Sequence, residues 1–139
     1  MRPFTFIVLF TSLVLVASLA FSQSSNEICC TWVNKSYVSD EQPQKIIFNY
    51  DGTFETYKHK DAKDPLLRGN FQVAEQWKDS EGAIWYKLKA IDMSGTELYL
   101  VRISKEGDRL EFVHKSSAYP ERIEEKATSY CTYMRTPRE

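Results

Sequence analysis

The side chains with the greatest capacity for chemistry in this chain are two histidines and three cysteines. The histidines are His59 and His114, and the cysteines are Cys29, Cys30 and Cys131. They fall into no ligand spacing typical of a zinc site, and neither histidine belongs to a nucleophile motif. The chain also lacks a Gly-rich phosphate loop and an HExxH pair. We therefore expect a protein that is not an enzyme and that uses no cofactor or metal.

The charge balance argues against two classes of partner. The 139 residues carry 18 Lys and Arg against 19 Asp and Glu, which gives a formal net charge of −1. Binding to nucleic-acid phosphates needs a basic excess, and binding to an anionic membrane surface needs a polybasic patch. The sequence has neither feature. The partner we expect is a small apolar or amphipathic ligand or, in the alternative given below, another protein.

Residues 1–22 have the pattern of a secretory signal peptide. Arg2 supplies a positive charge, residues 4–20 are almost wholly apolar, and a small-x-small cleavage site precedes Gln23. A membrane anchor is the alternative, but the apolar stretch is at the short edge of the spanning range. We expect a secreted or periplasmic protein with one domain over residues 23–139 and no membrane span after signal removal.

Eight segments after residue 22 have the composition of β-strands and are separated by turn signals. They are residues 28–36, 45–50, 53–58, 68–77, 83–91, 97–104, 109–114 and 128–135. Asp51-Gly52, between the second and third segments, is the strongest hairpin signal in the chain. No long stretch shows a helical period, although Pro120 allows one helical turn over residues 121–125. The sequence therefore predicts an all-β fold, either a barrel or a sandwich.

The links between these segments alternate in length. Residues 37–44, 59–67 and 115–127 form long links between strands. Most of the other links between consecutive strands are short. In an antiparallel meander, alternate links lie at the same end of the sheet, whereas a Greek-key sandwich does not predict this sorting. The pattern favours an eight-stranded antiparallel up-and-down barrel with a loop-rich mouth and a tight closed end.

The sequence around Trp32 resembles the opening strand of a lipocalin-type barrel, which carries an early Gly-x-Trp motif. In that family the Trp plugs the closed end, and an Arg near the end of the last strand packs across its ring. Trp32 and Arg135 match these positions, and Cys30 stands where the family has glycine. The chain is most similar to the small bacterial lipocalin-like proteins. The resemblance implies a lipocalin-like (calycin) barrel that binds a small, largely apolar molecule.

A barrel also makes a disulfide possible, because its first and last strands are neighbours. Cys131 would then lie beside Cys29 or Cys30, and a bridge would close a loop of roughly 100 residues, worth about 4.7 kcal/mol. Export permits such a bridge. We favour Cys30–Cys131 slightly over Cys29–Cys131. A strained Cys29–Cys30 bridge and three reduced core thiols are the alternatives.

Alternation along each segment predicts an inward face. Together with a tyrosine from the mouth, the inward residues form the predicted ligand site: Tyr37, Phe48, Phe54, Phe71, Tyr86, Leu88, Leu98, Phe112, His114 and Tyr130. Thr132 and Met134 share the predicted inward face with Tyr130, whereas Arg102 is expected to face outward. Small-molecule pockets have this composition. The same residues could equally fill a solid core.

Two functions follow from these two interiors. With a cavity, the protein is an exported barrel that binds an apolar or amphipathic molecule. With a solid interior, it is a protein-interaction or inhibitor module that uses the loops 37–44, 59–67 and 115–127. Trp77 and Trp85 flank a tight turn, and we interpret them as a cross-strand aromatic pair rather than as a sugar site.

Overall fold

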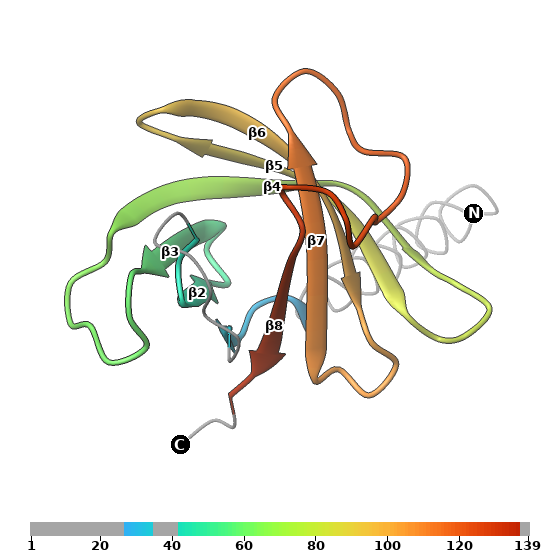
Figure 1. Cartoon of the computed structure of the whole chain (residues 1–139), viewed down its shortest axis with the longest axis horizontal. Helices are drawn as coiled ribbons and strands as arrows, with labels where there is room; N and C mark the ends of the chain where they lie inside the picture. Colours follow the sequence, from blue (N-terminus) through green and yellow to red (C-terminus); the bar gives the residue numbers. More distant parts are fainter. Residues whose placement is uncertain (1–26, 35–41, 137–139) are drawn as a thin grey trace, which may run out of the picture.

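The computed structural model describes residues 27–34 and 42–136, which form eight antiparallel strands closed into a barrel (Figure 1). The strands are β1 (Thr31–Val33), β2 (Lys45–Phe48), β3 (Thr53–Tyr57), β4 (Leu67–Lys78), β5 (Ile84–Asp92), β6 (Gly95–Ile103), β7 (Arg109–Lys115) and β8 (Cys131–Arg135). Each strand pairs with the next along the chain, and β8 returns to pair with β1. This confirms the all-β, eight-stranded up-and-down barrel.

Two expectations from the sequence fall on residues outside the described structure, and a third differs from it. The signal peptide over residues 1–22 and the mouth residue Tyr37 are outside the described residues. Residues 121–125 form bends and turns rather than a helical turn. Within residues 27–34 and 42–136, no helix has the length and apolar character needed to span a membrane.

The register between β1 and β8 closes the cylinder. Trp32 lies opposite Arg135, and Val33 lies opposite Met134. The short β2–β3, β4–β5 and β6–β7 turns lie at this end of the barrel, and the long β3–β4 and β7–β8 connections lie at the other end. The β2–β3 hairpin turns at Gly52, whose φ of 85° favours glycine. The long and short links are therefore sorted between the two ends as the sequence predicts.

The long strand β4 turns a corner of the barrel. Its first residues pair with β3, and the rest pair with β5 (Figure 1). A β-bulge shifts the register between Val73 and Glu75. Gly69 allows a close crossing, because an added Cβ would lie 2.4 Å from the Ile91 carbonyl oxygen and 2.7 Å from the Phe54 ring. A glycine and a bulge together let one strand serve two differently oriented partners.

Large side chains fill the closed end of the barrel. Trp32, Tyr86 and Tyr133 are each 0% exposed. The Trp32 indole N–H donates a hydrogen bond of 3.0 Å to the carbonyl oxygen of Ile28. Because the polar atom of the indole has its partner, the ring can be buried without an unsatisfied donor. The segment before β1 thus helps to fill the closed end of the barrel.

Arg135 lies beside Trp32 in the register but does not stack on its ring. The side chain of Arg135 is exposed and reaches the β6–β7 turn, where its Nη1 is 3.9 Å from a Cβ built on Gly107. Among the described residues, the arginine that packs over an indole is Arg102, 5.4 Å from the centre of the Trp85 ring. The neighbouring strand positions are therefore as expected, whereas the cation–π contact lies on the outer face.

That outer face carries a row of side chains across five strands. The register places Trp77, Trp85, Arg102, Glu111 and Thr132 next to one another in turn. The two indoles stack with centres 5.8 Å apart, which confirms the predicted aromatic pair. An oxygen of Glu111 lies 2.6 Å from the Arg102 guanidinium. Arg102 thus faces outward, and its buried charge partner satisfies it.

The inward face of β8 differs from the expectation by one residue. Cys131 and Tyr133 belong to the core, whereas Tyr130 lies on the outer side, where its hydroxyl donates to Glu111 at 2.8 Å. The Thr132 hydroxyl lies on the same side, 3.0 Å from the Tyr130 hydroxyl. Tyr and Thr can take either face of a strand, so the apolar pattern of this short segment did not fix its register.

The inward face of β6 is shifted in the same way. Tyr99 faces the interior, whereas Leu98 and Leu100 lie on the outer face. Leu100 is nevertheless buried beside Val113. Lys87, in the same cross-strand row, lies 5.7 Å from the Tyr119 ring of the β7–β8 connection, so this connection covers part of the outer face. A strand that is covered on both faces carries apolar residues on both faces, so its sequence does not show the two-residue alternation that would identify the inward face.

The expected Cys30–Cys131 disulfide is not formed: Cys29, Cys30 and Cys131 are buried thiols outside any disulfide. The N–H of Thr136 bonds to the carbonyl of Thr31 at 3.0 Å, so Cys30 is level with the end of β8. Cys131 begins that strand, and at about 3.3 Å per residue it lies about 16 Å away. A disulfide needs Cα atoms within about 7 Å. Neighbouring strands do not bring these cysteines to the same level.

Candidate ligand-binding cavity

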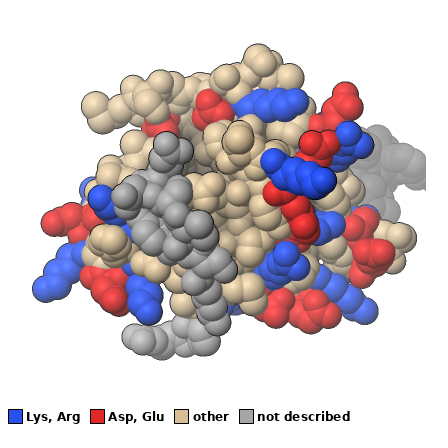
Figure 2. Space-filling view, in the orientation of Figure 1, with Lys and Arg blue, Asp and Glu red and all other residues tan. Residues whose placement is uncertain are grey.

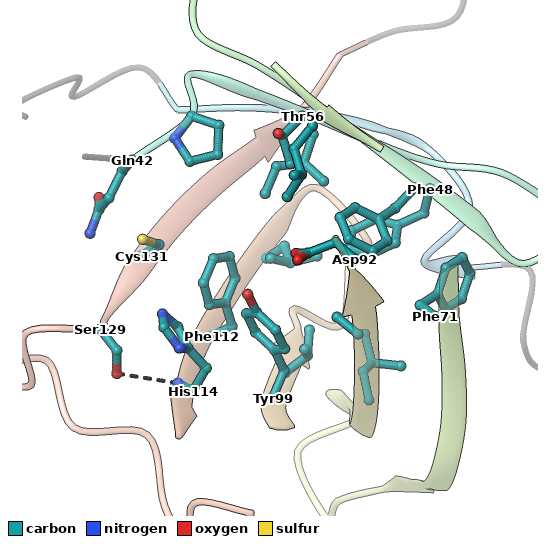
Figure 3. A pocket seen from close by; sticks show the side chains of 18 of the residues that line it. Gln42, Phe48, Thr56, Phe71, Asp92, Tyr99, Phe112, His114, Ser129 and Cys131 are labelled. Atoms are coloured by element: carbon teal, nitrogen blue, oxygen red, sulfur yellow. Dashed lines mark hydrogen bonds between the residues drawn. The ribbon is translucent and has the colours of Figure 1, made fainter. Parts of the chain in front are cut away.

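A cavity of about 710 Å³ lies inside the barrel and reaches the mouth (Figure 3). Inward side chains of β2 to β8 form its wall, and residues of the long connections form its rim. Volumes of roughly 300–1,000 Å³ are typical of sites that hold one small molecule. The interior is therefore filled at the closed end and open at the mouth.

Two groups of aromatic rings lie on either side of this cavity (Figure 3). In one, the Phe48 ring is 5.2 Å from Phe71 and 6.4 Å from Phe54. In the other, the Tyr99 ring is 5.2 Å from Phe112 in an edge-on arrangement. Aliphatic residues complete the apolar wall: Ile46, Leu66, Leu67, Leu88, Ala90, Val101 and Leu110. Such a wall favours the removal of apolar ligand surface from water.

His114 is the histidine of the cavity wall, at the end of β7. Its Nδ1 lies 2.9 Å from a carboxylate oxygen of Glu97, and its backbone N–H donates to the Ser129 hydroxyl at 3.2 Å. Its ring centre is 4.9 Å from that of Tyr99. Because Glu97 holds Nδ1, Nε2 is the ring nitrogen that His114 can offer to a ligand.

Tyr99 brings a hydroxyl into the apolar wall. Burial raises its pKa to about 12, and the charges of Glu97 and Asp92 add to the effect. The phenol therefore stays protonated across the physiological range and can donate or accept one hydrogen bond.

Asp92 is the acidic residue of the cavity wall, at the end of β5. Its Oδ1 accepts hydrogen bonds from the backbone N–H of Ser94, at 2.7 Å, and from the Ser94 hydroxyl. This Asx turn forms the tight link between β5 and β6. The turn therefore fixes a carboxylate at the rim of an otherwise apolar cavity.

Cys131 lines the cavity from the first position of β8. Burial raises the pKa of its thiol to about 11. A protonated thiol is a poor nucleophile, so Cys131 serves as a small apolar wall residue. Gln42, Thr56, Thr128 and Ser129 add neutral polar groups to the wall.

The predicted site residues divide into four groups. Those that line the cavity are Phe48, Phe54, Phe71, Leu88, Phe112 and His114. Tyr86 faces inward but is fully buried in the filled end. Leu98 and Tyr130 lie on the outer face, and Tyr37 is outside the described residues. The predicted residues that line the cavity thus come from strands in which the alternation of apolar and polar residues is clear.

Of the cavity-wall residues absent from the predicted site, three were missed for identifiable reasons. Tyr99 was missed because β6 is apolar on both faces, and Cys131 because it was assigned to a disulfide. Asp92 was read only as a turn residue, yet it is also the last residue of β5. Inward alternation from Tyr86 through Leu88 would have pointed to it, because the same period reaches residue 92.

A second depression lies outside the barrel, over β8, β1 and β2. Its volume is about 1190 Å³, and its lining includes outward residues such as Val33, Ile47 and Met134. It lies over outward-facing residues, whereas the first cavity lies among inward-facing side chains of seven strands. The position inside the barrel makes the first cavity the better candidate for a ligand site.

Comparison with known proteins adds no assignment: no protein-family model, no curated protein and no solved structure matches this chain. Within the described ranges, no group of three or more His, Cys, Asp and Glu residues is arranged to hold a metal ion. The site is therefore interpreted from its own geometry, which is an apolar cavity with a small number of polar groups at one end.

Proposed function

We propose that this protein is an exported, lipocalin-like barrel that binds one small apolar or amphipathic molecule in its cavity. The observation that carries the proposal is the cavity of about 710 Å³ at the mouth of a closed barrel. Aromatic and aliphatic residues form most of its wall. Burial of ligand surface, at about 25 cal/mol per Å², would supply the binding free energy.

The position of the polar groups supports an amphipathic ligand. Asp92, His114 and Ser129 belong to the rim, whereas Ile46, Val101 and Leu110 lie among the apolar wall residues. A molecule with an apolar body and one polar end would place the body inside and the polar end near the mouth. A few polar groups suffice to fix orientation in such a site.

Two further features support the lipocalin-like assignment. Trp32 is buried at the closed end, and its neighbour across the first and last strands is Arg135. This pairing of strand positions is the part of the resemblance that supports the proposal; the Arg–Trp stacking that the resemblance also implies is not formed by Arg135. We propose a binding role rather than a catalytic one, because the thiol and the phenol of the wall, Cys131 and Tyr99, are both held protonated by burial.

Fluorescence titration with N-phenyl-1-naphthylamine, a neutral apolar probe, tests this function. We expect saturable uptake at one site per chain. Ala90→Trp would place an indole in the cavity and weaken uptake at least tenfold, whereas Lys89→Trp, at a neighbouring position on the other face of β5, would not.

The alternative of an interaction module predicts a different result. Leu66 is 63% exposed and Met93 is 100% exposed, and both flank the mouth. Absence of probe uptake, together with capture of a protein partner that is lost in a Leu66→Ser and Met93→Ser double variant, would replace the binding function with this one. The cavity argues against the solid interior on which the alternative was based.

A further inference from the structure

The charge of the cavity wall distinguishes between classes of amphipathic ligand. Of the 20 described residues that line the cavity, none is Lys or Arg, and Asp92 is the carboxylate among them. A buried anion without a cationic partner is costly, whereas a buried ammonium beside a carboxylate is compensated. The wall is therefore better suited to a cation than to an anion.

The His114–Glu97 pair does not reverse this sign. If His114 is neutral, the pair contributes the negative charge of Glu97. If His114 is protonated, its charge is balanced by the carboxylate oxygen 2.9 Å from Nδ1. With Asp92, the mouth side of the cavity is net negative in either state. The raised pKa of Tyr99, to which both carboxylates contribute, agrees with this sign.

Two cations of the cavity-forming strands pair with carboxylates on the outside of the barrel. Arg68 lies 3.4 Å from Glu55, and Lys87 lies 3.3 Å from Glu75. Figure 2 shows Lys and Arg interspersed with Asp and Glu around the edge of the visible face. These side chains do not line the cavity, so they supply no partner for an anionic head group within it.

The aromatic part of the wall also favours a cation. Phe48, Phe71, Tyr99 and Phe112 present rings to the cavity (Figure 3). The face of an aromatic ring carries a negative partial charge that attracts an ammonium group. The wall thus combines a carboxylate with aromatic rings.

We propose, resting on the proposed binding function, that the cavity selects a hydrophobic amine: an amphipathic molecule whose apolar body fills the barrel and whose protonated amino group lies against Asp92. A fatty acid of the same length would place its carboxylate against Asp92 and would be rejected. A fatty alcohol would bind with intermediate affinity, because the Thr56 and Ser129 hydroxyls can pair with it.

Competition by three ligands with one common chain tests this inference. Dodecylamine, dodecanol and dodecanoate, each below its micellar concentration at pH 7, would compete against N-phenyl-1-naphthylamine. We expect the amine to displace the probe at a concentration at least tenfold lower than the carboxylate. A carboxylate that competes as well as the amine, or better, would overturn the selectivity and leave the binding function standing.

Asp92→Asn identifies the residue responsible. Asparagine keeps the oxygen that accepts the Ser94 hydrogen bonds, so the turn is retained and only the charge is removed. We expect the preference for amine over carboxylate to fall by at least fivefold while dodecanol affinity stays within twofold. An unchanged preference in Asp92→Asn would contradict the assignment to Asp92.

Asp108→Asn is the matched control, because it removes the same charge from the closed-end turn, where Asp108 accepts a hydrogen bond from the Ser104 hydroxyl at 2.7 Å. It should leave the ligand preference unchanged. An equal loss of preference in both variants would assign the effect to net charge and overturn the inference. No uptake of the probe or of any ligand would instead refute the binding function itself.

Discussion

The two ends of the barrel are built from similar residue types but differ in how completely they are packed. At the closed end, Trp32, Tyr86 and Tyr133 are fully buried, and the Trp32 indole and the Tyr133 hydroxyl bond to backbone carbonyls at 3.0 and 2.8 Å. Along the cavity, by contrast, Phe48 and Phe71 are only partly buried and line the open interior. The comparison indicates that the closed end supplies most of the packing stability, whereas the cavity leaves room for the proposed ligand.

The largest effect should come from emptying the closed end. Trp32→Ala removes a fully buried ring together with the hydrogen bond to Ile28. We expect a loss of about 3–5 kcal/mol in the free energy of unfolding, measured by urea denaturation. If the variant does not fold, Trp32→Phe gives a smaller measurable loss. A stability equal to that of the wild type would remove the distinction between the two ends.

Glu111, on the outer face beside the closed end, should give the barrel an acid-sensitive contribution to stability. Burial alone raises its pKa, but hydrogen bonds from Arg102 and Tyr130 and the charges of Arg102 and Arg109 outweigh burial and hold the pKa below its usual value. Such a group stabilises the fold fully above the pKa of an unfolded glutamate, about 4.3, and the contribution is lost as pH falls toward the folded pKa.

Glu111→Gln tests this contribution. We expect a cost of about 2 kcal/mol at pH 7, because the hydrogen bonds to a charged group are weakened. The stability of the variant should also fall less steeply than that of the wild type between pH 5 and pH 3. Parallel pH profiles for the two proteins would mean that Glu111 has the same pKa in the folded and unfolded states.

A smaller effect on stability is expected at the mouth. Phe71→Ala removes a ring that is only partly buried and faces the cavity, so the loss should be below about 2 kcal/mol. The same variant should weaken uptake of the apolar probe more than Trp32→Phe does. A stability loss as large as that of Trp32→Ala would show that the mouth is packed as tightly as the closed end.

We expect that no disulfide among the three cysteines contributes to stability. Alkylation of the unreduced, denatured protein is expected to label Cys29, Cys30 and Cys131 alike, as counted by mass spectrometry. In the folded protein Cys131 should react slowly at pH 8, because burial raises its pKa to about 11, and bound ligand should slow it further. Recovery of a single labelled thiol would indicate a disulfide, and a bridge that includes Cys131 would require a different register for β8.

The contrast between the ends also explains what the sequence could predict. Strand order and the closed barrel followed from turn signals such as Asp51-Gly52 and from link lengths, which are local properties. The inward faces of β2, β3 and β7 followed from clear alternation. The faces of β6 and β8 did not, because Leu98 and Leu100 border a covered outer surface and Tyr130 pairs with Glu111 outside.

The sequence could not predict the cavity, because its presence depends on the volume that the barrel encloses. Phe48, Phe71 and Phe112 could fill a barrel or line one, and the outcome depends on how far apart the strands hold them. The disulfide was predicted wrongly for a similar reason. Strand order makes β1 and β8 neighbours, but the register decides which residues of the two strands lie opposite each other, and it keeps Cys131 away from Cys30. Composition fixes neither quantity.

The most direct test of the central claim is a titration of the ¹⁵N-labelled protein with dodecanol, followed by amide and indole NMR shifts. The account predicts saturable shifts for wall residues such as Leu88, Ala90 and Tyr99, while the Trp32 indole N–H, bonded to Ile28, stays in place. Shifts confined to the outer depression around Val33 and Met134, or shifts that never saturate, would contradict it.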